Sequence, residues 1–224
     1  MTDPQISARS LLRETFAAIG DIYTPLLIIN SPVLIFSVLD SVIDLPSSRA
    51  GQIINLFCRL AIILVWGATI FYSYRSLTGK RVTVNEAFQQ AKIRFFQLFL
   101  VNLIYGLLLF TGLIALIIPG LYISYRLMFS SYHTVIYNYS PIKSISSSWE
   151  LTKGRWWLLF RATSLLLVVT IVPIILISLL IDPTGESIPY KVAVDVLVFL
   201  LMPLMNVYLL LLYLRLQESA ATMK

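Results

Sequence analysis

Six stretches of this sequence are long and apolar enough to cross a lipid bilayer, and this feature restricts the possible folds more than any other. A helix needs about 20 mostly apolar residues to cross the hydrocarbon layer. Because backbone polar groups must be paired there, each stretch is predicted to be helical. The sequence therefore predicts an all-α membrane protein of about six transmembrane helices, with residues 1–224 forming a single integral membrane domain. The stretches are residues 24–43, 53–74, 95–118, 121–137, 157–181 and 192–214.

The composition agrees with a chain that is largely dissolved in lipid, since 58% of the 224 residues are hydrophobic and 12% are charged. Cys58 is the single cysteine and His133 the single histidine. An internal disulfide and a metal site built from these residue types are therefore not expected. The sequence also contains no recognisable catalytic or phosphate-binding motif. We expect a protein without catalytic activity and without a cofactor.

The distribution of lysine and arginine predicts the orientation. If the N-terminus is cytoplasmic, most of these residues fall on the cytoplasmic side, and mainly Arg49 and Lys191 fall on the other. The positive-inside rule then predicts that both termini are cytoplasmic. Anionic lipid headgroups explain the net charge of +6, and nucleic acid is not expected as a partner. The cytoplasmic set comprises Arg9, Arg13, Arg75, Lys80, Arg81, Lys92, Arg94, Lys143, Lys153, Arg155, Arg161, Arg215 and Lys224.

An internal repeat is indicated by the segments that precede the odd-numbered stretches. Residues 83–95 and 140–154 both predict an amphipathic helix on the inner membrane surface, and residues 3–23 a fainter third one. The chain then consists of three units, each a surface helix followed by a transmembrane hairpin, at about 1–75, 76–138 and 139–216. Phe88, Lys92, Arg94, Phe95, Phe96 and Phe99 correspond to Trp149, Lys153, Arg155, Trp156, Trp157 and Phe160, each 61 residues later.

Local signals place these helices and the turn between them. Thr83 and Glu86 have the spacing of a capping box, and Ser140 precedes a proline suited to the first helical position. The apolar faces, which include Phe88 and Trp149, are predicted to lie against lipid. Pro119-Gly120 predicts a tight turn that joins the third and fourth stretches as a hairpin.

Residues 118–160 resemble the YciC-like bacterial membrane proteins and the related membrane domain attached to some glycerophosphodiester phosphodiesterases. The resemblance implies a polytopic fold and a bacterial inner-membrane location. It does not extend to the hydrolase activity, because one histidine cannot supply that enzyme's metal site. The residues that carry it are Pro119-Gly120, Arg126, Ser140-Pro141-Ile142 and the run from Ser148 to Trp157, SWELTKGRWW.

Four ionisable residues within the apolar stretches form a candidate intramembrane charge cluster: Asp40, Arg59, Arg126 and Asp195. Counting the rise per residue places all four roughly 5 to 10 Å below the outer surface. A charge in hydrocarbon is costly and needs a partner or access to water. Two interpretations stay open, a buried ion-pair cluster and separate arginines that extend to the headgroups while the acids lie at the water boundary.

The fourth stretch carries a candidate polar stripe, in which Arg126, Ser130, His133 and Tyr137 are spaced to share one helical face. Such a stripe either packs against polar groups of neighbouring helices or lines a path for a solute or a proton. Asn102 and Asn206 are possible packing partners. In a path, His133 would be the pH-sensitive element.

Aromatic and basic residues around position 153 are candidates for contact with lipid headgroups: Trp149, Lys153, Arg155, Trp156 and Trp157. The tryptophans alone would form an interfacial aromatic belt. We expect an organising, regulatory or lipid-interacting membrane component, and the alternative is a small-solute transporter or channel that uses the polar stripe. Expected partners are the bilayer, anionic headgroups, and another membrane protein or a second copy of the chain.

Overall fold

The computed structural model describes residues 7–43, 49–182, 184–185 and 187–222, and all regular structure in them is helical. This confirms the predicted all-α class. The helices are α1 (Ala8–Ala18), α2 (Gly20–Ile43), α3 (Arg49–Leu77), α4 (Val84–Ile93), α5 (Phe95–Ala115), α6 (Ile117–Leu127), α7 (Ser130–Tyr137), α8 (Pro141–Leu151), α9 (Trp156–Ile181) and α10 (Ile188–Thr222).

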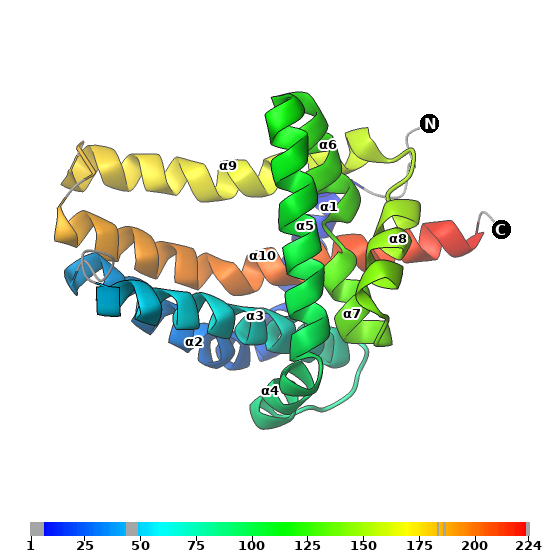
Figure 1. Cartoon of the computed structure of the whole chain (residues 1–224), viewed down its shortest axis with the longest axis horizontal. Helices are drawn as coiled ribbons and strands as arrows, with labels where there is room; N and C mark the ends of the chain where they lie inside the picture. Colours follow the sequence, from blue (N-terminus) through cyan, green and yellow to red (C-terminus); the bar gives the residue numbers. More distant parts are fainter. Residues whose placement is uncertain (1–6, 44–48, 183, 186, 223–224) are drawn as a thin grey trace.

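The helices form two parts, which we call the stem and the head. The stem consists of α2, α3, α9 and α10, which run side by side and connect in pairs at the end far from the head (Figure 1). The head consists of α1 and of α4 to α8, gathered at the opposite end. Both chain ends lie on the head side (Figure 1). An even number of passages through the stem explains why they lie together.

Five helices in the described part of the chain are long and apolar enough to cross a membrane: Gly20–Val42, Gly51–Leu77, Phe95–Ile114, Trp156–Ile181 and Ile188–Thr222. Large apolar side chains such as Leu176, Leu179 and Leu180 are exposed along the stem. Exposed apolar area on this scale is stable only against lipid or another protein. The protein is therefore an integral membrane protein.

The predicted span over residues 121–137 is wrong, because this segment does not form one helix. The chain breaks at Met128 and Phe129 between α6 and α7. At 1.5 Å per residue these helices are about 16 and 12 Å long, too short for the hydrocarbon layer. The turn before α6 is also earlier than predicted, since Leu116 is extended (φ −175°, ψ 157°) and Pro119-Gly120 lies within the first turns of α6.

Helices α5 and α6 form a tight hairpin that lies across the direction of the stem (Figure 1). A Cβ added at Gly112 would lie 2.9 Å from the Cα of Gly120, so the two helices approach closely because both positions lack side chains. Of the stem helices, α3 makes the main contact with α5. There a Cβ on Gly67 would lie 2.6 Å from Leu98 Cδ1.

Helices α1, α4 and α8 lie in the segments predicted to be surface helices, but the buried faces of α4 and α8 differ from the prediction. The capping box of α4 is present, with the Glu86 amide donating to Thr83 Oγ1 at 3.2 Å. This helix buries Ala87 and Ala91 and packs on α3 rather than only on lipid. Helix α8 buries Ser144 and Ser148, a hydroxyl face that the prediction did not identify.

The two best-matched repeat segments share a local geometry. Arg94 directly precedes α5 with φ −100° and ψ 7°, and Arg155 directly precedes α9 with φ −111° and ψ 19°. Each of them lies between a short helix and a long apolar one. The following helices diverge, since α9 belongs to the stem and α5 lies across it (Figure 1).

Candidate functional site

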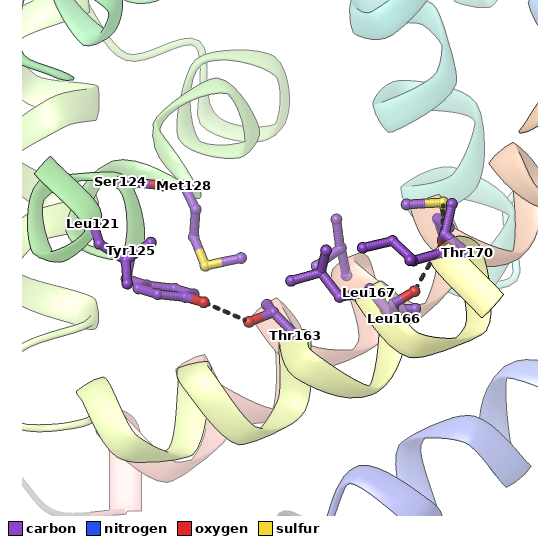
Figure 2. Close-up of a pocket in the computed structure, with 11 residues that line it drawn as sticks. Leu121, Ser124, Tyr125, Met128, Thr163, Leu166, Leu167 and Thr170 are labelled. Atoms are coloured by element: carbon purple, nitrogen blue, oxygen red, sulfur yellow. Dashed lines mark hydrogen bonds between the residues drawn. The ribbon is translucent and has the colours of Figure 1, made fainter. Parts of the chain in front are cut away.

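An apolar crevice of about 420 Å³ lies between α6 of the head and helices α9 and α10 of the stem (Figure 2). Helix α6 and the residue after it contribute the side chains of Leu121, Ser124, Tyr125 and Met128. In the close-up, Met128 and Leu167 extend into the space between α6 and α9. The lining is completed by Thr163, Leu166, Leu167, Thr170 and Ile171 of α9, with Met205 and Leu209 of α10.

The few polar atoms of the crevice are satisfied by the protein itself. The Thr163 hydroxyl lies 3.2 Å from the Tyr125 hydroxyl, a bond that connects α9 to α6 (Figure 2), and donates to the Leu159 carbonyl at 2.8 Å. Thr170 Oγ1 donates to the carbonyl of Leu166 at 2.8 Å. With its polar atoms paired in this way, the crevice offers a ligand mainly hydrocarbon contact. That chemistry suits an acyl chain better than a polar solute.

The position of the crevice along α9 matches one leaflet of a bilayer. From Thr163 to Ile171 the helix rises about 12 Å, against about 15 Å for half of the hydrocarbon layer. Trp156 begins α9 at the head. If α9 spans the bilayer, the crevice therefore lies in the leaflet nearer the head and ends close to the membrane centre.

Arg126 lies on α6 with its side chain against α8. It is 3% exposed, and its guanidinium carbon lies 4.3 Å from the centre of the Trp149 ring and 5.8 Å from that of Tyr122. These distances are typical of cation–π contacts. Its own carbonyl accepts hydrogen bonds from the hydroxyls of Ser148 at 2.9 Å and Thr152 at 3.1 Å.

The charge cluster predicted from Asp40, Arg59, Arg126 and Asp195 is not formed. Ion pairs among the described residues join only Arg215 to Glu14 and Glu218. Asp195 instead accepts hydroxyl hydrogen bonds from Ser37 at 2.6 Å and Ser41 at 2.9 Å. Arg59 donates to the side chain of Asn55, and Arg126 lies in the head rather than at the far end of the stem. The predicted depth of Arg126 was wrong because it was counted along residues 121–137 as if they formed one transmembrane helix.

The predicted polar stripe is divided by the break between α6 and α7, and its α7 members contact α10. His133 Nδ1 lies 3.3 Å from the Tyr213 hydroxyl, and the Tyr137 hydroxyl donates to Gln217 Oε1 at 3.0 Å. Ser130 donates to the carbonyl of Leu127. Asn102 and Asn206, the partners considered from the sequence, bond to carbonyls of their own helices. This arrangement favours packing over a path.

Burial lowers the pKa of His133 to about 4. The rings around it belong to Tyr137, Tyr139 and Tyr213. The nearest hydrogen-bonding atom, the Tyr213 hydroxyl, already accepts from the Gln217 amide at 2.8 Å. The donor in the contact between this hydroxyl and His133 Nδ1 depends on the tautomer of the ring, and burial keeps the histidine neutral near pH 7.

The predicted headgroup residues differ in their partners and in their exposure. Arg155 donates to the Leu216 carbonyl at 2.9 Å and to the Ser219 hydroxyl at 3.0 Å, so it connects the start of α9 to the end of α10. Trp156 is partly buried against Tyr125. Lys153 and Trp157 are exposed, and Trp149 is half-exposed beside Arg126.

Sequence reasoning missed the hydroxyl face of α8 and the crevice. Ser144, Ser148 and Thr152 are four residues apart, a spacing that marks one helical face and was available from the sequence. The crevice had no comparable signal, because its lining comes from three helices whose packing is not encoded in any local pattern. Comparison of the chain with protein-family models, curated proteins and solved structures gives no match.

Proposed function

We propose that this protein is a non-catalytic, lipid-interacting component of the bacterial inner membrane that holds a phospholipid acyl chain in the crevice between α6 and α9. The observation that supports this most is the crevice itself, an apolar hollow of about 420 Å³ with internally bonded hydroxyls. The length of the crevice along α9 is close to the thickness of the hydrocarbon part of one leaflet. Methionines at positions 128 and 205 give its lining the adaptability suited to chains of different length.

The proposed orientation has the stem crossing the bilayer and the head at the cytoplasmic surface. Most described lysines and arginines lie in the head or at the head end of the stem, as the positive-inside rule requires of the cytoplasmic side. Helices α5 and α6 would then lie along the inner leaflet. The resemblance to YciC-like membrane proteins belongs to the same proposal, since it implies the same membrane. The transporter alternative has less support, because the stripe on α7 is bonded to α10.

Filling the crevice tests the proposal. Leu167 lines it and is 52% exposed, so Leu167→Trp adds bulk there without entering the core. Leu176→Trp is the matched control, because Leu176 is 53% exposed on the same helix and lies outside the crevice. Native mass spectrometry after mild detergent extraction should show that the first variant loses most of the retained phospholipid and the second keeps it. Equal retention in both variants would exclude the crevice as the lipid site.

A further inference from the structure

The buried charge of Arg126 points to a second binding feature. We propose that Arg126, Tyr122 and Trp149 form a site for the phosphate group of an anionic lipid. This inference rests on the proposed lipid interaction and deepens it, because it names the charge of the headgroup. We call these three residues the arginine site.

The guanidinium of Arg126 has no anionic partner in the part of the chain that the structure describes. No carboxylate of those residues lies within ion-pairing distance of it. Its Nε atom is buried without a hydrogen-bond partner. A guanidinium stays charged at any physiological pH, so losing a proton cannot relieve this burial.

The contacts present compensate for only part of the burial. Desolvating an unpaired ion costs more free energy than a desolvated cation–π contact returns. The nearby hydroxyls of Ser148 and Thr152 are directed to the backbone carbonyl of Arg126, not to its guanidinium. The balance indicates that the site is completed by an anion from outside the described chain.

The surroundings indicate which anion. The fork of a guanidinium matches phosphate through two parallel hydrogen bonds. Tyr122 and Trp149 are 42% and 40% exposed, and they are aromatic residues of the type found at membrane interfaces. Phosphate is the anionic group that phospholipid headgroups share. Leu121 and Tyr125 of the crevice lining are next to Tyr122 and Arg126 in sequence, so the crevice and the arginine site share helix α6.

The test measures the Tm of delipidated protein in one detergent. Phosphatidylglycerol and phosphatidylcholine are added in separate samples, and inorganic phosphate is compared with chloride at equal ionic strength. Phosphatidylglycerol should raise the Tm of the unmodified protein by more than phosphatidylcholine does. Arg126→Met should lose this difference. Arg81→Met, which removes an exposed arginine between α3 and α4, should keep it. A response to inorganic phosphate without a preference for phosphatidylglycerol would assign the site to free phosphate and overturn the lipid assignment.

A second variant covers the case in which Arg126→Met does not fold. Arg126→Lys keeps the charge but loses the fork, and should raise the half-maximal phosphatidylglycerol concentration about tenfold. Arg126 variants that keep the normal lipid preference would overturn the arginine site. Leu167→Trp separates this result from failure of the proposed function, because filling the crevice should reduce binding of both lipids regardless of headgroup charge.

Discussion

At the residue scale, a chain of hydrogen bonds between α7 and α10 ends at the single histidine. Tyr137 donates to Gln217, the Gln217 amide donates to Tyr213, and the Tyr213 hydroxyl lies 3.3 Å from His133 Nδ1. The sequence identified His133 and Tyr137 as one polar face, but the partners on α10 are 80 residues away and have no local signal.

We expect the burial of His133 to make stability depend on pH. Its pKa is about 4 in the folded protein, against about 6.5 in an unfolded chain. The neutral histidine therefore contributes fully above about pH 6.5, and stability falls as the pH falls from 6.5 towards 4, by roughly 3 kcal/mol when complete. Thermal unfolding between pH 7.5 and 4.5 in one detergent measures this. His133→Gln should flatten the fall.

The control for this prediction is Tyr213→Phe. It removes the hydrogen bond to His133 but keeps the titrating group, so it should lower the Tm at every pH and preserve the slope. An equally steep fall in His133→Gln would show that other groups cause the pH dependence.

At the element scale, α8 determines where α6 ends and α7 begins. Ser148 Oγ accepts from the Phe129 amide at 3.2 Å and donates to the Arg126 carbonyl at 2.9 Å. One side chain thus pairs two backbone groups that the break leaves without helical partners. Thr134 and Ser144, whose oxygens lie 2.8 Å apart, add a second bond between α7 and α8. These hydrogen bonds stabilise the break between α6 and α7, which hydropathy alone did not reveal.

Removing that bridge should destabilise the head. Ser148→Ala leaves the Phe129 amide without its partner in a buried position, which should cost roughly 1 to 3 kcal/mol. Ser146→Ala changes an exposed serine of the same helix and should stay within about 0.5 kcal/mol of the unmodified protein. The free energy of unfolding in a fixed detergent compares them. Equal effects of the two substitutions would mean that water pairs the Phe129 amide.

At the scale of the whole molecule, hydropathy predicted helices and membrane insertion but not how the helices are arranged. Five of the six apolar stretches form long helices, because length and apolar composition suffice for that. The crosswise direction of α5 depends on long-range contacts such as Gly67 with Leu98, which a hydropathy pattern does not contain. The prediction of the charge cluster was wrong for the same reason, because the depth of Arg126 was inferred from a six-span topology that the structure does not have.

The two topologies make opposite predictions for the turn between α5 and α6. Six spans would place this turn at the outer surface. The stem-and-head arrangement, with the head in the cytoplasm, places it inside, because α5 lies across the stem (Figure 1). Ile118 is 77% exposed near that turn, so Ile118→Cys in a Cys58→Ala background reports its side.

An impermeant thiol reagent applied to intact cells should not label Ile118→Cys, because a crosswise α5 keeps the turn on the head side of the bilayer. Thr184→Cys, in the segment between α9 and α10 at the far end of the stem, should be labelled from outside. Ser146→Cys, exposed on α8, should react only after permeabilisation. Labelling of both Ile118→Cys and Thr184→Cys from outside would restore six spans. In that case α5 and α6 with α7 would have to turn into the direction of the stem, and the crevice could not keep its present lining.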